Sequence, residues 1–305
     1  RIMEELSMIA MKTIGREGSA NLLKIMKIIR IYSISFFFLL LSFNFSGREI
    51  HQSTFIYEDK PDIEVFYSLP EEVNDETMLL FIIHGASRTA EGYLEDFLPH
   101  IQEKNLIAVA PKFSKESYPH YAFLNRSTID GKKLPASTPN IDNALGDIFE
   151  IISSKYNIRN DKYRIYGHSG GAQFVQRYLL FSNDSRIDKA VLANAGFYTF
   201  MNQNLYPFGL RDIDLDDEEI KRVLRTKVAL YVGENDTERN FRNLKGARAQ
   251  GKNRLVRGET FFLNLVSYAE ELKMPFRWQY QIIKNVGHDN ADMVSGAAYF
   301  ILEDL

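Results

Sequence analysis

From residue 51 onward, short apolar runs alternate with segments of helical periodicity. The run Met78–Ile83, with the sequence MLLFII, contains no polar residue, which is typical of a strand buried on both faces of a parallel sheet. Apolar residues then follow at helical spacing in Ala90–Lys104, and the same pattern returns in Ile141–Tyr156. Alternation of this kind predicts an α/β fold with a mostly parallel sheet and helices on both faces.

The complete pattern predicts an eight-stranded sheet, whose first two strands alternate apolar and polar residues like a half-exposed antiparallel pair. The expected strands are Ser53–Tyr57, Ile63–Tyr67, Met78–Ile83, Leu106–Ala110, Tyr163–Tyr166, Lys189–Ala193, Val228–Val232 and Trp278–Ile283. The expected helices are Ala90–Lys104, Ile141–Tyr156, Ala172–Phe181, Thr260–Leu272 and Ala291–Leu302. We expect Pro111 to stop the fourth strand, and we expect residues 112–139, rich in Tyr, Pro, Ser and Gly, to form a long surface loop.

Composition narrows the class of protein further. The chain has 305 residues, of which 45% are hydrophobic and 25% charged, so it is globular rather than disordered or fibrous. A net charge of only −3 gives the protein no overall positive potential that would attract nucleic acid, and we expect no nucleic-acid partner. The absence of cysteine excludes disulfides, zinc–thiolate sites, iron–sulfur clusters and a cysteine nucleophile.

The N-terminal residues 1–47 are predicted to be an upstream segment followed by a secretory signal peptide, with Met26 as the start. A basic stretch at Met26–Arg30 precedes the uncharged apolar run Ile31–Phe43, which is the order of a signal peptide. An uncleaved membrane anchor and a buried helix are the alternatives. We therefore expect an exported protein, periplasmic or secreted, with residues 48–305 as one catalytic domain. Loose membrane association would arise only through an uncleaved signal segment.

The sequence Gly167-His168-Ser169-Gly170-Gly171 fits the pattern G-x-S-x-G. The pattern alone is a weak signal, but here a predicted buried strand precedes it and an apolar helix follows. A sharp strand-to-helix turn of this kind exposes the serine hydroxyl above the sheet, and its small neighbours make the turn sterically feasible. We expect Ser169 to be a nucleophile, although a glycine-rich turn without chemistry is the alternative.

A serine nucleophile needs a base, and the chain has six histidines. His288 lies on a loop directly after the last predicted strand, where the carboxyl ends of the parallel strands meet. His168 adjoins the serine and should point away from it. The others precede the turn in edge-strand, helix-end, strand-end or loop contexts; they are His51, His84, His100 and His120. His288 is therefore the predicted base.

The base in turn needs a carboxylate that fixes its tautomer. Strand Val228–Val232 is followed at once by Gly233-Glu234-Asn235-Asp236, which supplies two candidates. We favour Asp236 for its place on the loop, and Glu234 is the competitor. Asp289 is too close in sequence to His288 to be its natural partner.

Acyl transfer also needs hydrogen-bond donors for a developing oxyanion. The amide of Gly170 lies at the start of a predicted helix, and strand Met78–Ile83 leads into His84-Gly85-Ala86. The loop could bring the amide of Ala86 opposite that of Gly170, with Gly85 permitting close approach. His84 would then be a structural histidine that braces the loop.

Together these residues resemble the α/β-hydrolase superfamily, whose order of nucleophile, acid and base is that of Ser169, Asp236 and His288. The segment Ile83–Ala90 (IHGASRTA) is similar to the H-G-x-x-x-T-A segment of the polyhydroxyalkanoate-depolymerase-like and feruloyl-esterase-like branch. The segment Tyr163–Gly171 fits the same branch. The resemblance implies an α/β-hydrolase fold, the catalytic residues Ser169, Asp236 and His288, and an oxyanion hole formed by the amides of Ala86 and Gly170.

The sequence thus predicts a serine hydrolase that cleaves a small-molecule or oligomeric carboxylic ester through an acyl-enzyme. Alternatives are a peptidase, a thioesterase or an acyltransferase with the same three residues, or a catalytically silent binding protein. No metal or phosphate-loop pattern occurs, so we expect no metal and no cofactor. The aromatic stretches Tyr118–Phe123 and Phe197–Phe208 could roof a pocket or simply pack.

One strongly basic segment, residues 239–257, carries no acid and follows the predicted acid loop. Its cationic residues are Arg239, Arg242, Lys245, Arg248, Lys252, Arg254 and Arg257. A solvated segment, or one paired with the acidic stretch 212–219, is one interpretation. The other is a basic rim that attracts an anionic ester or an envelope surface.

Overall fold

A computed structural model of the chain describes residues 47–211, 213–241 and 243–305. The predicted signal peptide and the start at Met26 lie outside the described residues, as do Asp212 of the acidic stretch and Arg242 of the basic segment. Residues Arg48–Leu305 form one compact unit, and the fold below is that of this unit.

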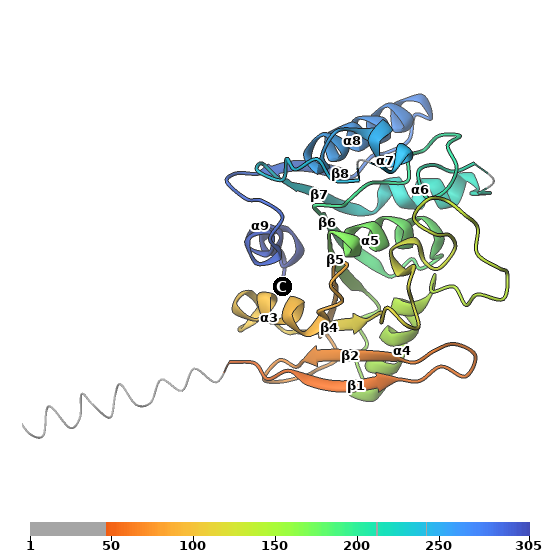
Figure 1. Cartoon of the computed structure of the whole chain (residues 1–305). Coiled ribbons are helices and arrows are strands. Elements are labelled where there is room, and N and C mark those ends of the chain that lie inside the picture. Colours follow the sequence, from red (N-terminus) through yellow and green to blue (C-terminus); the bar gives the residue numbers. More distant parts are fainter. Residues whose placement is uncertain (1–46, 212, 242) are drawn as a thin grey trace, which may run out of the picture. The chain divides into compact units, whose positions relative to one another are not determined.

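The unit is built on an eight-stranded sheet with the order β1-β2-β4-β3-β5-β6-β7-β8 (Figure 1). The strands are β1 (His51–Phe55), β2 (Ile63–Ser68), β3 (Met78–Ile83), β4 (Leu106–Lys112), β5 (Tyr163–His168), β6 (Ile187–Ala193), β7 (Lys227–Gly233) and β8 (Trp278–Ile283). Strand β2 pairs antiparallel with β1 and β4, and every other pair is parallel. The mostly parallel eight-stranded sheet predicted from the sequence is confirmed.

Helices cover both faces of the sheet (Figure 1). One face carries α3 (Ala90–Ile101) and α9 (Asn290–Ile301), while the other carries α4 (Ala144–Tyr156), α5 (Gly170–Phe181), α6 (Asp217–Arg225) and α8 (Arg254–Glu271). The short elements η1 (Tyr121–Phe123) and α7 (Lys245–Gln250) complete the set. Successive side chains of a strand point to opposite faces, so the uninterrupted apolar run of β3 supplies both hydrophobic layers.

Two expectations about the region after β4 were wrong. Pro111 does not end the strand, because it pairs with Val65 and β4 continues to Lys112. Strand β3 pairs with β4 only as far as Val109, so a proline is tolerated where that edge has no strand partner. Residues 112–139 are also not merely a surface loop. Phe113 and Tyr118 are fully buried, and the Phe113 ring lies 5.0 Å from that of Phe174 on α5.

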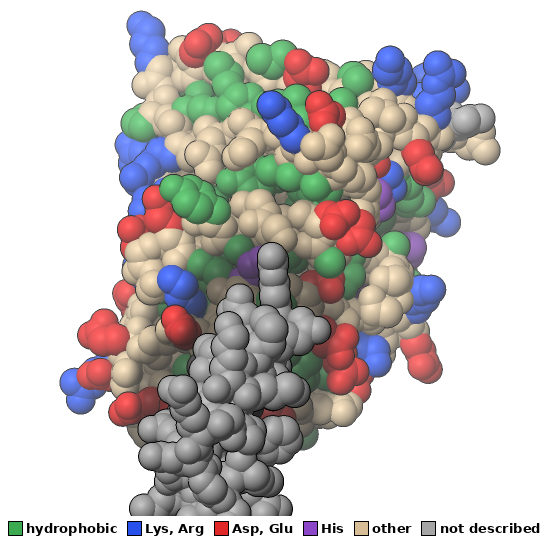
Figure 2. Space-filling model, turned by 90° about the vertical axis from the view of Figure 1, so that its left-hand side faces the viewer, with side chains coloured by type: hydrophobic (Ala, Val, Ile, Leu, Met, Phe, Trp, Pro, Cys, Tyr) green, Lys and Arg blue, Asp and Glu red, His purple; other side chains and the backbone are tan. Residues whose placement is uncertain are grey.

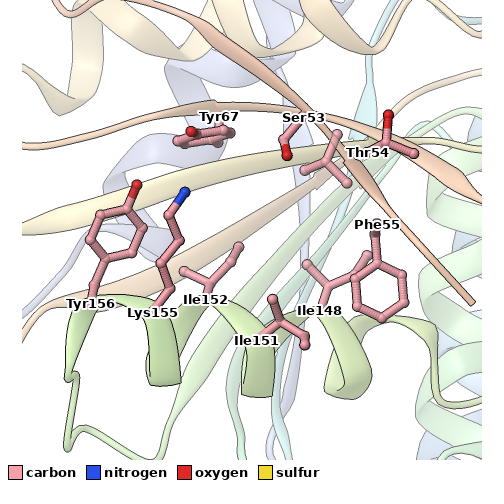
Figure 3. Close-up of a pocket in the computed structure, with 10 residues that line it drawn as sticks. Ser53, Thr54, Phe55, Tyr67, Ile148, Ile151, Ile152, Lys155 and Tyr156 are labelled. Atoms are coloured by element: carbon pink, nitrogen blue, oxygen red, sulfur yellow. The ribbon is translucent and has the colours of Figure 1, made fainter.

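The face of the unit that carries α3 and α9 has charged side chains of both signs (Figure 2). Figure 2, viewed from the side of α3 and α9, shows basic and acidic side chains interspersed. In the described part of the chain, no helix is both long and apolar enough to cross a membrane. A groove of about 70 Å³ lies between the β1–β2 pair and α4, where Ile148, Ile151 and Ile152 face the strands (Figure 3). The residues that line it include none of the predicted site residues.

Candidate active site

Ser169 lies in the turn between β5 and α5 with a backbone φ of 56° and ψ of −112°. A positive φ is strained for a residue with a β-carbon and persists only where the surroundings enforce it. The surroundings here are tight, because a methyl group built on Gly171 would overlap the carbonyl oxygen of Ile83. The Ser169 amide donates to the carbonyl of Ala193 at 2.9 Å, which ties the turn to the end of β6.

A chain of hydrogen bonds joins the predicted nucleophile, base and acid. His288 Nε2 lies 3.0 Å from Ser169 Oγ, and His288 Nδ1 lies 2.7 Å from Asp236 Oδ2. The histidine side chain is 34% exposed, whereas that of Asp236 is 1% exposed. An ionised Asp236 accepts from Nδ1–H, which leaves Nε2 free to accept the proton of the serine hydroxyl. The loops after β5, β7 and β8 supply these three side chains at the carboxyl edge of the sheet.

The carboxylate of Asp236 has a second partner that the sequence reasoning did not assign to it. Arg254 Nη1 donates to Asp236 Oδ1 at 2.9 Å, so the two carboxylate oxygens face different groups. Burial alone would raise the pKa of Asp236, but its hydrogen bond to His288 and the charges of His288 and Arg254 outweigh burial and hold the pKa below its ordinary value. The carboxylate therefore stays ionised at neutral pH.

Glu234, the competing acid, lies elsewhere in the same loop. Its Oε2 accepts the backbone amide of Asn285 at 2.9 Å, so it braces the loop before His288 rather than contacting the imidazole. Asn194, at the end of β6, was not singled out from the sequence. Its side chain accepts from the amide of Gly233 at 2.7 Å and donates to the carbonyl of Gly287 at 2.8 Å. The ends of β6 and β7 and the histidine loop are thereby joined.

The loop after β3 lies directly against the serine turn. A methyl group built on Gly170 would lie 3.3 Å from the amide nitrogen of Ala86, so the amides of these two residues are neighbours beside Ser169. His84 is buried in this loop, and its Nε2 accepts the amide of Phe113 at 3.0 Å. Burial lowers the pKa of His84 to about 4, so the ring is neutral near pH 7.

His168, between Gly167 and Ser169, forms a platform for the predicted base. Its ring centroid lies 4.8 Å from that of His288, and its Nδ1 is hydrogen-bonded to the Tyr93 hydroxyl at 2.9 Å. Burial, together with the charge of His288, lowers the pKa of His168 to about 3. A neutral ring therefore lies beside the base and adds no competing charge.

The basic segment is not a uniformly solvated strip. Arg254 contacts the candidate acid, and Arg257 is fully buried, where it donates to the side chain of Asn240. The aromatic stretch after β6 mainly packs, because Phe197 is buried and lies 5.0 Å from Phe208 between ring centroids. Within the described ranges, no three His, Asp or Glu side chains are grouped to hold a metal ion.

This combination of a strained serine turn after a central parallel strand with acid and base loops at the same sheet edge defines an α/β hydrolase. A scan against protein-family models found no match, and a search of curated proteins also found none. Solved structures do match. Poly(aspartic acid) hydrolase-1 from Sphingomonas sp. KT-1 is 30% identical with a TM-score of 0.76, over 83% of this chain and 98% of that chain.

Two further solved structures resemble the chain in fold. A poly(3-hydroxybutyrate) depolymerase, LpqC, from Bordetella parapertussis is 22% identical with a TM-score of 0.75, over 85% of this chain and 91% of that chain. An S-formylglutathione hydrolase from Agrobacterium tumefaciens is 12% identical with a TM-score of 0.53, over 84% and 96% respectively. The chain belongs to the α/β-hydrolase superfamily, in one family with poly(aspartic acid) hydrolase-1, and is a hydrolase.

Proposed function

We propose that the protein is a serine hydrolase that cleaves carboxylic esters through an acyl-enzyme intermediate. The observation that carries this proposal is the continuous hydrogen-bonded chain from Ser169 Oγ through His288 to Asp236, at 3.0 and 2.7 Å. A serine hydroxyl is a poor nucleophile without an adjacent base, and these contacts supply one.

In the proposed reaction, Ser169 Oγ attacks the carbonyl carbon of the ester while its proton passes to His288 Nε2. Asp236 keeps Nδ1 protonated and stabilises the imidazolium that forms. The amides of Ala86 and Gly170 donate to the oxyanion. The imidazolium then gives its proton to the leaving alkoxide, and the ester C–O bond breaks. A water molecule then attacks the carbonyl carbon of the acyl-enzyme while His288 takes its proton. His288 returns a proton to Ser169 Oγ as the bond to the acyl group breaks and the carboxylic acid leaves.

An amide substrate is the second candidate, because one relative with 30% identity is a poly(aspartic acid) hydrolase. The same three side chains serve either bond, and the leaving group then decides whether His288 protonates an amine or an alkoxide. Turnover of p-nitrophenyl esters of graded chain length, compared with poly(aspartic acid) and short peptides, separates the two. Faster cleavage of the polyamide would replace the ester proposal.

We also infer that the protein is exported, because the sequence of residues 26–43 has the order of a signal peptide. Export would place the enzyme outside the cytoplasm with its substrate. Fractionation of cells that express the full chain tests this inference. Recovery of the intact, unprocessed chain in the cytoplasm would contradict it.

The nucleophile is tested by Ser169→Ala. We expect turnover to fall by about 10⁴- to 10⁶-fold, because the variant retains binding but has no attacking oxygen. A fluorophosphonate probe should label the wild type and not the variant. Circular dichroism should show the variant folded, since a smaller side chain in the turn removes no core contact. Turnover close to wild type would refute the assignment.

A further inference from the structure

We propose that Arg254 is a positioning residue for the catalytic acid. In this proposal, which rests on the proposed function, its guanidinium fixes the carboxylate of Asp236 in the orientation that accepts the Nδ1–H of His288. The two oxygens of Asp236 are divided between two partners, with Oδ2 at 2.7 Å from His288 and Oδ1 at 2.9 Å from Arg254. Rotation of the carboxylate would break both contacts.

The contact is sheltered from water. The side chain of Arg254 is 14% exposed and that of Asp236 only 1%, so solvent screens the pair far less than an ion pair on the surface. Burial also makes an unpaired carboxylate costly, so Asp236 depends on its two donors. Loss of Arg254 would therefore affect the acid itself and not only the local packing.

The backbone around Arg254 is held to the acid loop independently of the ion pair. Asn253 begins α8 by accepting the amide of Val256 at 2.9 Å, and its side-chain nitrogen donates to the carbonyl of Thr237 at 3.2 Å. Thr237 directly follows Asp236. The start of α8 and the acid loop are thus joined by Asn253, which keeps the guanidinium in register with the carboxylate.

The position of Arg254 is unfavourable for the helix alone. Arg254 and Arg257 both lie in the first turns of α8, and the first turn contains no acidic residue. The N-terminal end of a helix carries partial positive charge and favours anions, so cations there are destabilising. The contact with Asp236 offsets this cost. The contact with the carboxylate of Asp236 therefore explains an arginine at this position, and the stability of the helix does not.

Other charged and titratable side chains lie near the Arg254–Asp236 pair. In the described part of the chain, the titratable or charged side chains that face it include His168 from β5, Tyr198 from the loop after β6, and Arg254 and Arg257 from α8. Asp289, the neighbour of His288, instead caps α9 by accepting the amide of Asp292. Arg254 is the cation of this group that contacts the carboxylate directly.

Three variants test the proposal. Arg254→Met removes the charge and the hydrogen bond, Arg254→Gln keeps a neutral donor, and Arg254→Lys keeps the charge without the planar fork. The control is Arg225→Met, which removes an exposed arginine near the end of α6. The measurements are kcat/KM from pH 4.5 to 9 and the downfield proton resonance of His288 Nδ1–H in the resting enzyme.

For Arg254→Met and Arg254→Gln, we expect kcat/KM to fall about 10- to 100-fold from misplacement of the acid. We also expect the His288 Nδ1–H resonance to shift or broaden, because the carboxylate that accepts this proton is no longer held in place. Arg254→Lys should restore part of the rate and of the resonance, because it keeps the charge without the planar fork. Arg225→Met should match the wild type in both.

A kcat/KM and a downfield proton resonance equal to those of the wild type, in whichever neutral variant folds, would show that Arg254 only anchors α8 and would overturn the proposal. The proton resonance needs no substrate, so it reports on Arg254 even if the ester assignment fails. Failure of the proposed function itself would appear in Ser169→Ala, as retained turnover, while the Arg254 variants still shift the proton.

Discussion

Glu234 and Asp236 are two carboxylates in one short loop, and their surroundings give them different tasks. The side chain of Asp236 is turned inward to His288 and Arg254, while that of Glu234 is exposed and accepts a backbone amide of the histidine loop. A buried carboxylate between two donors is oriented and ionised, which is what a neutral imidazole base requires. An exposed one can only support the loop.

The two carboxylates can be separated by isosteric substitutions. We expect Asp236→Asn to lower kcat by about 10⁴-fold, because an amide favours the wrong tautomer of His288. Glu234→Gln should lower kcat less than tenfold, since an amide oxygen can still accept from Asn285. Steady-state kinetics of both variants provide the measurement. Equal losses in the two variants would contradict the division of roles.

The residues now grouped around Ser169 were partly predictable from the sequence. Ser169, Asp236 and His288 each follow a predicted strand, and parallel strands bring their carboxyl ends to one edge. Their catalytic roles stay a prediction. Arg254 could not be assigned, because its contact depends on where α8 begins and on the direction of one long side chain. Asn194 follows a buried strand and carries a polar side chain, which is a signal that could have found it.

At the scale of elements, the serine turn requires β3, β5 and α5 to approach one another very closely. Gly171 stands in the first turn of α5 against the backbone of Ile83 at the end of β3. The same contact sets the distance between the loop that carries Ala86 and the serine turn. Glycine at position 171 is therefore a condition of the site as well as of packing.

Substitution of Gly171 tests this condition. Gly171→Ala should destabilise the protein by about 1–3 kcal/mol, because backbone atoms must move apart, and it should lower kcat by displacing Ala86. The matched control is Gly92→Ala within α3, where an added methyl group meets only the end of the Glu95 side chain at 3.9 Å. That variant should gain about 0.5–1 kcal/mol. Urea unfolding measures both. A Gly171→Ala protein as stable as wild type would contradict the argument.

The elements themselves differed in how well the sequence predicted them. The buried strand Met78–Ile83 and the edge strand Trp278–Ile283 were predicted with their observed bounds, because an apolar run in the first and a β-rich composition in the second mark both ends. Helix α6 was not among the helices expected from the sequence, since its charged residues outnumber its apolar ones. The start of α8 was placed at Thr260 instead of Arg254 because its first residues look like a basic loop.

At the scale of the whole molecule, two buried histidines link stability to pH. Burial holds the pKa of His84 at about 4 and that of His168 at about 3, against an unfolded value of about 6.5. The unfolded chain therefore binds more protons than the folded one between these values. The stabilisation is complete above about pH 6.5 and is lost as the pH falls toward the folded pKa values.

We accordingly expect the free energy of unfolding to decrease by up to about 1.4 kcal/mol per pH unit for each histidine between pH 6 and pH 4.5. Urea titrations over this range measure the slope. His168→Gln should have a shallower slope, whereas His100→Gln, at the partly exposed end of α3, should leave it unchanged. A wild-type unfolding midpoint that is constant from pH 7 to pH 4.5 would argue against this linkage.

The bridge made by Asn194 has a mechanical consequence for the hydrolase. One amide side chain joins Gly233 at the end of β7 to Gly287, the residue before His288. The loop that carries the imidazole is consequently tied by hydrogen bonds to the ends of β6 and β7. The histidine loop cannot move away from the serine turn without breaking the hydrogen bond from Asn194 to the carbonyl of Gly287.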